Sequence, residues 1–178
     1  MDRASPERLF LWDGEIFQVE SASLAHERIV SNLVGWLRAA LGAGPCEVLP
    51  SNLRVRVPGT DRYVYPDAII LCGAPDLEDG EADTLLNPTV VLEVLSRGTE
   101  AFDRGEKAAG YRRIPHLTAY VLVSQASLRV EVFTRGEGSW TLREYAGASA
   151  AELPLGPGSI RVPLEEIYAR SGVTDRGE

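Results

Sequence analysis

Two acidic side chains are the first candidates for chemistry in this chain. Glu93 lies within the apolar run 88–95, and Asp67 follows Pro66 directly at the start of the apolar run 68–71. An ionised carboxylate inside an apolar strand loses much of its hydration unless it is paired, hydrogen-bonded or bound to a metal. An aspartate beside a proline is also an ordinary turn residue. If the two strands are neighbours, however, the two carboxylates form a hard-oxygen site suited to Mg²⁺ or Mn²⁺.

A helix after the Glu93 strand supplies the candidate cation. Lys107 is the only lysine among the 18 Lys and Arg residues. Asp103, Lys107 and Tyr111 are spaced four apart, which places them on one stripe of a helix capped by Thr99 or a neighbour. A lysine beside a metal-polarised phosphate can position a water or stabilise developing charge, so the set predicts phosphodiester hydrolysis. Alternatively, Asp103 and Lys107 form an ordinary helix salt bridge.

The first helix is predicted to begin after a cap at Ser21 or Ser23 and to end near Leu41. His26 and Glu27 lie in its first turn, where either could complete the site or serve only the helix. Gly42 and Gly44 should end the helix. Its apolar face is predicted from Leu24, Ile29, Leu33, Trp36, Leu37 and Leu41.

Strands are predicted from alternating apolar residues and turn signals. Residues 8–12 and 15–19 should form a hairpin through Asp13 and Gly14. In the Glu93 strand, Val90, Leu92 and Val94 should share one face, with Val91, Glu93 and Leu95 on the other. Further strands are expected at 46–49, 53–57, 63–71, 119–123, 129–134, 139–145 and near Ile160, followed by a helical turn at 164–168. This mixed order predicts an α/β or α+β sheet sandwich.

The length and composition indicate one domain. The chain has 178 residues, of which 44% are hydrophobic, and we expect a single domain over 1–170 with a flexible tail at 171–178. It shows no signal peptide and no apolar run long enough to span a membrane, so a soluble cytoplasmic protein is expected. Cys46 and Cys72 do not form a CxxC motif and are interpreted as reduced core residues.

The formal net charge of −8 argues against an extended basic nucleic-acid surface. Arg54 and Arg56 alternate with apolar residues and should share an exposed face. Five acids between the strands are expected to form a solvated loop, and their spacing does not match an EF-hand. They are Asp76, Glu78, Asp79, Glu81 and Asp83.

Three motifs, taken together, are fairly specific. They are Tyr65-Pro66-Asp67, then Pro88-x-x-x-x-Glu93-Val94-Leu95-Ser96, then Asp103-x-x-x-Lys107-x-x-x-Tyr111. In this combination they resemble the Uma family of restriction-endonuclease-like proteins, within the PD-(D/E)XK nuclease superfamily. The resemblance extends over nearly the whole chain. It implies a restriction-endonuclease-like core, with a mixed central β-sheet flanked by helices and an N-terminal β-hairpin.

The resemblance also implies roles for single residues. Asp67 and Glu93 would hold Mg²⁺ or Mn²⁺, and Lys107 would supply the ammonium. The superfamily usually has its lysine two residues after the glutamate, where this chain has Leu95, so Lys107 acts from a migrated position. Accessory roles fall to His26, Glu27, Asp103 and Tyr111. Nucleic-acid phosphates, of DNA in the main expectation, would be contacted by Arg54, Arg56, Arg97, Arg104, Arg112 and Arg113.

The sequence leaves a second class of function open. The acidic net charge and the absent strand lysine are also compatible with a nuclease fold that no longer cuts and serves as a binding or regulatory module. A homodimer is expected in either case. A substrate of RNA or of branched DNA is a third possibility, and no base-reading element is recognisable.

Overall fold

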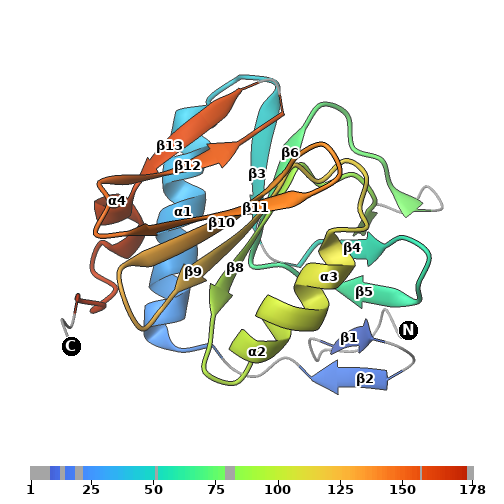
Figure 1. The fold of residues 1–178 in the computed structure, drawn as a ribbon, viewed down its shortest axis with the longest axis horizontal. Helices are drawn as coiled ribbons and strands as arrows, with labels where there is room; N and C mark the ends of the chain where they lie inside the picture. The colour runs from blue at the N-terminus through green and yellow to red at the C-terminus, as the bar shows by residue number, and fades with distance from the viewer. Residues whose placement is uncertain are drawn as a thin grey trace.

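A computed structural model describes residues 9–12, 15–18, 22–50, 52–78, 83–156 and 158–175. The described strands form three sheets, and helices cover both faces of the largest one (Figure 1). The predicted mixed α/β architecture is confirmed. No helix within these ranges combines the length and the apolar character needed to cross a membrane.

The central sheet has six strands, and it brings the Asp67 and Glu93 segments together. From edge to edge they are β11 (Trp140–Ala146), β10 (Arg129–Arg135), β9 (Ala119–Ser124), β8 (Val90–Leu95), β6 (Ala68–Cys72) and β3 (Cys46–Pro50). Strand β8 runs parallel to β9 and antiparallel to β6. The sheet is therefore mixed, and the strand that begins directly after Asp67 is the neighbour of the strand that contains Glu93.

A second sheet contains the N-terminal hairpin. Its order is β2 (Glu15–Gln18), β1 (Leu9–Trp12), β5 (Arg62–Val64), β4 (Arg54–Val57) and β7 (Thr84–Leu85). Trp12 lies opposite Glu15, which confirms the predicted hairpin with a two-residue connection. The connecting Asp13 and Gly14 lie outside the described residues. Residues 65–67 lead from β5 into β6, so Pro66 marks the step from one sheet to the other.

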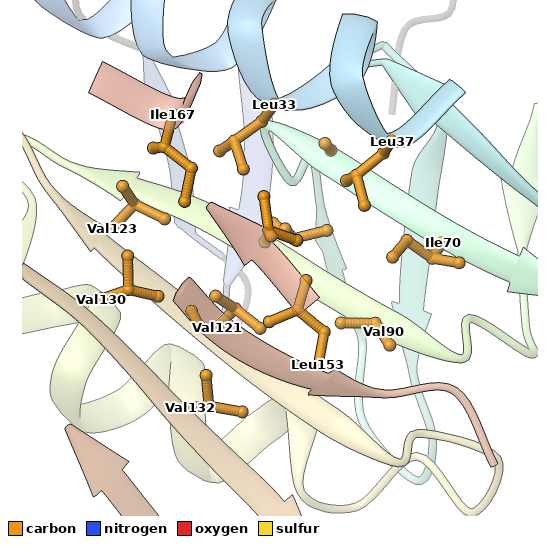
Figure 2. Close-up of a cluster of buried hydrophobic side chains, with 14 of the residues drawn as sticks. Leu33, Leu37, Ile70, Val90, Val121, Val123, Val130, Val132, Leu153 and Ile167 are labelled. Carbon is orange, nitrogen blue, oxygen red and sulfur yellow. The ribbon is translucent and has the colours of Figure 1, made fainter. Parts of the chain in front are cut away.

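One face of the central sheet packs against helices and a hairpin through a cluster of buried apolar side chains (Figure 2). The covering elements are α1 (Leu24–Leu41), α4 (Leu164–Tyr168), β12 (Ala150–Pro154) and β13 (Ser159–Pro163). Val90, Leu92 and Val94 of β8 point into this core, as the alternation predicts. Because these three side chains of β8 are apolar, they need no hydrogen-bonding or charged partner in this core.

The opposite face is covered by a short helical segment in three parts: α2 (Glu100–Phe102), a π-helical turn η2 (Asp103–Lys107) and α3 (Ala108–Tyr111). Val91 and Leu95 pack in this second core, and Glu93 is on the same face. Thr99 is the N-cap, as predicted, although its own side chain makes no capping bond. Instead, the Thr99 backbone N–H donates to Ser96 Oγ at 3.1 Å. A regular α-helix was expected where the π-helical turn lies.

Helix α1 agrees closely with its sequence signals. The Ser23 side chain accepts a hydrogen bond from the His26 backbone N–H, and Gly42 forms the C-cap with φ 54°. Because a left-handed φ suits glycine, the helix ends where Gly42 permits the turn. Ile29, Leu33 and Leu37 are buried. Leu24 is 66% exposed, so its predicted place on the apolar face is wrong.

Two local predictions are corrected. Cys46 and Cys72 form a disulfide rather than remaining reduced, because the register of antiparallel strands β3 and β6 places them directly opposite each other. Strands β7 and β12 were not predicted. β7 has only two residues, whereas β12 does alternate between buried and partly buried positions, so its pattern was missed. Ser171 is buried and Val173 packs against the first core, while the predicted boundary at 170 stays a prediction.

Candidate active site

The register of β6 and β8 places the two candidate carboxylates side by side. Ala68 pairs with Leu92 in an antiparallel ladder, so the next position along brings Asp67 beside Glu93. Asp67 Oδ2 accepts a hydrogen bond from the Val94 backbone N–H at 2.7 Å. This bond joins the start of β6 to the second half of β8. It fixes the Asp67 carboxylate where β6 begins.

Glu93 has the partners that its position in an apolar strand requires. It is only 3% exposed. Lys107 Nζ lies 2.7 Å from Glu93 Oε1, and the Tyr111 hydroxyl donates to the same oxygen at 2.9 Å. Burial raises the pKa of Glu93 to about 8, helped by the charges of Asp103 and Asp67 and opposed by the Lys107 ammonium. The site therefore holds Glu93 as a carboxyl group that gains a proton easily.

Lys107 lies between two carboxylates. Its Nζ is 3.2 Å from Asp103 Oδ1, an ion pair without hydrogen-bond geometry. Asp103 is 3% exposed. Burial lowers the pKa of Lys107, but the charges of Glu93 and Asp103 outweigh it, so the pKa is raised and the ammonium stays charged. The predicted stripe of Asp103, Lys107 and Tyr111 thus faces Glu93, although it runs through a π-helical turn.

The first turn of α1 also reaches the start of β6. His26 Nε2 lies 3.2 Å from Asp67 Oδ2. Burial lowers the pKa of His26, but the hydrogen bond and charge of Asp67 more than offset this, and the pKa is raised. Glu27 has a side chain that is 62% exposed, with Oε1 3.9 Å from His26 Nδ1. His26 therefore contacts the carboxylate pair directly, and Glu27 lies at the margin.

The donor set fits a divalent metal of the magnesium class. The contacts described above fall on Glu93 Oε1 and Asp67 Oδ2, which leaves Glu93 Oε2 and Asp67 Oδ1 for a cation. Among the described residues no group of three or more His, Cys, Asp and Glu side chains is arranged to hold a metal. Mg²⁺ is commonly held by one or two carboxylates, with waters and substrate phosphate oxygens filling the other positions. Two carboxylates are therefore sufficient for that ion.

The arginines of β4 are engaged in ion pairs with the acidic loop. Arg54 is 6% exposed, which corrects its predicted place on an exposed face; its guanidinium lies 3.0 Å from Asp83 Oδ1. Arg56 pairs with Glu78, and both guanidinium groups lie over the Tyr63 ring. Glu78 and Asp83 are therefore not simply solvated, as the sequence indicated. Strand pairing brings the arginines and these acids together across more than 20 residues.

The remaining arginines differ in their surroundings. Arg104 is held between Glu100, with Nε to Oε1 at 2.8 Å, and Glu131, with an N–O distance of 2.6 Å. Arg112 lies with its guanidinium carbon 5.2 Å from the centre of the Phe133 ring. Arg97 is exposed, four residues after Glu93. Arg113 is also exposed, so Arg97 and Arg113 are both accessible to a phosphate outside the protein.

Two residues near the site were missed. The Tyr120 hydroxyl donates to the Asp103 carbonyl oxygen at 3.0 Å, and no sequence pattern indicates that contact. Glu131 is 6% exposed and accepts the Arg104 ion pair. The run Val130-Glu131-Val132 shows the same signal as Glu93, a carboxylate inside an apolar strand, and could have identified Glu131.

Comparison with known proteins agrees with this geometry. A family model named Uma2, with the description "Putative restriction endonuclease", matches residues 1–165. Two uncharacterised proteins of Synechocystis sp. are similar to the chain. The protein sll1609 is 33% identical over 138 residues, covering 77% of this chain and 78% of its own. The protein slr1290 is 31% identical over 163 residues, covering 85% of both chains.

The fold is also similar to a solved structure. The crystal structure of "a putative nuclease belonging to DUF820" from Anabaena variabilis superimposes with a TM-score of 0.72, covering 93% of each chain. Sequence identity is 16%, so this likeness concerns the fold. It confirms the nuclease-like core that the three motifs indicated.

Proposed function

The chain belongs to the Uma2 family, and we propose that it is a metal-dependent endonuclease that hydrolyses phosphodiester bonds of DNA. The observation that best supports this proposal is the convergence of Asp67, Glu93 and Lys107 where β6 begins beside the second half of β8. These three residues come from two strands and a helical segment. A buried glutamate held by the only lysine of the chain costs hydration that a purely structural role does not require.

Asp67 and Glu93 would hold Mg²⁺ or Mn²⁺. When bound, such an ion polarises the phosphate and lowers the pKa of a bound water. The Val94 N–H and His26 orient Asp67 through its Oδ2 atom. Tyr111 and Lys107 orient Glu93 in the same way. The protein thus fixes both carboxylates before the ion arrives.

Lys107 would stabilise the negative charge that develops on the phosphate, or position the attacking water. Its ammonium lies 2.7 Å from Glu93 Oε1, beside a carboxylate that would hold the cation. Asp103 keeps the ammonium charged. Arg97, exposed just after β8, would contact a neighbouring phosphate. The other predicted phosphate contacts, from Arg54, Arg56, Arg104, Arg112 and Arg113, stay predictions, and the first three are already bound to carboxylates.

Calorimetry followed by a cleavage assay tests the proposal. Wild type and Asp67→Asn would be titrated with Mg²⁺ and Mn²⁺ and then incubated with plasmid DNA, linear duplex, single strands and RNA. We expect binding and cleavage of DNA by wild type and the loss of both in Asp67→Asn. A control variant, Asp76→Asn, removes an acid outside the site and should bind and cut like wild type. Metal binding without cleavage of any substrate would instead favour a binding or regulatory module.

A further inference from the structure

The π-helical turn η2 is held on the sheet by contacts from three neighbouring strands. Lys107 Nζ meets Glu93 Oε1 of β8 at 2.7 Å. The Tyr120 hydroxyl of β9 donates to the Asp103 carbonyl oxygen at 3.0 Å. An Arg104 guanidinium nitrogen lies 2.6 Å from a Glu131 carboxylate oxygen of β10. The proposed reaction assigns no role in binding or chemistry to Tyr120 or Glu131, the strand residues of the second and third contacts.

Sheet register explains why these contacts lie under one turn. Leu122 of β9 pairs with Glu93 on one side and with Glu131 on the other. Glu93 and Glu131 therefore share a face, two strands apart, a separation of about 9–10 Å. Arg104 and Lys107 are three residues apart in the helical segment and so lie near each other on its surface. The segment thus rests on two buried carboxylates through two cations.

The Tyr120 hydroxyl acts on the backbone between them. Tyr120 is fully buried, and its ring packs between those of Tyr111 and Phe133 at centroid distances of 5.1 and 6.2 Å. The hydroxyl reaches the carbonyl of Asp103, the first residue of the π-helical turn. π-Helical turns inside helices are rare and are frequent at functional sites. A hydrogen bond to the carbonyl of this turn stabilises the conformation that presents Lys107.

We propose that Glu131 and Tyr120 are positioning residues, which hold Lys107 against Glu93 by fixing the π-helical turn to the sheet through Arg104 and the Asp103 carbonyl. Neither residue would touch the substrate or the cation. The catalytic part of this inference rests on the proposed nuclease function. The positional part concerns only where the Lys107 ammonium lies, and it can be measured without any turnover.

The single lysine makes that measurement specific. An amine-acylating reagent followed by peptide mass spectrometry reports on Lys107 alone once the N-terminal peptide is set aside. In the folded wild type, Lys107 is protected because it is ion-paired and its side chain is only 12% exposed. In Glu131→Gln we expect acylation of Lys107 to become about tenfold faster or more, since Arg104 loses its anchor. Turnover should fall on the order of 10- to 100-fold, with metal affinity unchanged.

Two further variants make the result decisive. Tyr120→Phe keeps the ring packing and removes only the hydroxyl, and it should also make Lys107 react faster. It therefore tests the proposal even if Glu131→Gln fails to fold. Glu144→Gln makes the same charge change on the next strand, directly opposite Glu131. Because the Glu144 side chain is 49% exposed and lies 4.0 Å from Arg129, this control should leave Lys107 protected and turnover unchanged.

The outcomes separate the two levels of the proposal. Faster acylation in Glu131→Gln and Tyr120→Phe, but not in Glu144→Gln, supports the positioning role even if wild type cuts no nucleic acid; in that case only the nuclease function fails. Folded variants that keep both the protection of Lys107 and the wild-type turnover would overturn the inference. So would a loss of metal affinity equal to the loss of turnover, because it would indicate a general disturbance of the carboxylate pair.

Discussion

The two faces of the central sheet are built by the same strands but differ in what they bury. On the α1 face, β8 contributes Val90, Leu92 and Val94, all apolar, to the first core. On the other face the same strand contributes Val91, Glu93 and Leu95. There the chain also buries Asp103 and Glu131, and it brings Lys107 and Arg104 to meet these acids. The same strand therefore contributes apolar residues to one core and a buried carboxylate to the other.

This difference separates stability from chemistry. Apolar burial contributes roughly 25 cal/mol per Å² and needs no partner. A buried ion pair gains little or nothing over apolar residues of similar size, while removing one partner from it is costly. Both faces contribute apolar burial to folding, and the buried charges on the Glu93 face make sense as a site that uses them. Substitutions on the two faces should accordingly affect stability and activity in different proportions.

The largest expected loss of stability comes from Lys107→Met. This change leaves Glu93 and Asp103 buried without their cation, and such a loss typically costs about 3–5 kcal/mol. Urea unfolding of the metal-free variant measures it. Cleavage should also disappear. A variant as stable as wild type would mean that the carboxylates do not depend on Lys107.

Leu33→Ala should cost about 2–5 kcal/mol, the usual range for a leucine truncated in a packed core. Leu33 is 2% exposed on the α1 face. Because no charged group is touched, cleavage per folded molecule should stay at the wild-type rate. Leu24→Ala is the matched control, since Leu24 is 66% exposed and its truncation should change stability by less than about 0.5 kcal/mol. Loss of activity in folded Leu33→Ala would contradict the claim that the α1 face affects stability and not activity.

A smaller effect, of opposite sign, is expected for Glu93→Gln in metal-free protein. The pKa of Glu93 is about 8 in the folded chain and near about 4.3 in an unfolded one. Between these values the folded protein binds more protons, so the stability of wild type falls as pH rises from about 4 to about 8. Glutamine does not titrate. Lys107 keeps Asp103 as a partner in this variant.

Glu93→Gln should therefore match wild type near pH ~4 and exceed it by about 1–3 kcal/mol near pH ~8. Thermal unfolding in a chelator across this pH range measures the difference. If wild type were more stable than Glu93→Gln at the highest pH tested, the charge of Glu93 would stabilise the fold. The claim that this charge is kept at a cost in stability would then be wrong.

A change in stability of only about 1 kcal/mol is expected for Lys107→Arg, because the charge is kept although the larger group must be accommodated. Activity should nevertheless fall to a small part of the wild-type value. A guanidinium is planar and larger than an ammonium, so it cannot occupy the same place beside Glu93 Oε1 and the phosphate. Steady-state cleavage rates measure this effect, and wild-type turnover would reduce Lys107 to an ion-pair partner.

Local patterns in the sequence were enough to predict the elements that build the site. Alternation assigned each residue of β8 to its face, and Ser23 and Gly42 marked the ends of α1. The three motifs pointed to Asp67, Glu93 and Lys107, which the fold does bring together, although their catalytic roles stay predictions. The expected homodimer and the cytoplasmic location also remain untested.

Contacts that depend on strand register were not predictable in this way. Cys46 meets Cys72, and Arg54 meets Asp83, only because particular residues of paired strands lie opposite or beside each other. Alternation fixes which face a residue occupies, but it does not fix which residue lies opposite it. The π-helical turn was not predictable from local spacing either, and its Asp103 carbonyl accepts a hydrogen bond from Tyr120, a residue of a distant strand. A regular helix would satisfy the same local spacing.

The most direct test of the account compares metal-dependent DNA cleavage by wild type and Glu93→Gln in preparations whose thermal stability is measured side by side. We predict that the variant is at least as stable as wild type near neutral pH and does not cleave. That combination would show that Glu93 is kept for chemistry at a cost in stability. Cleavage at the wild-type rate by a well-folded Glu93→Gln would contradict the assignment of Glu93 as a metal ligand and, with it, the proposed active site.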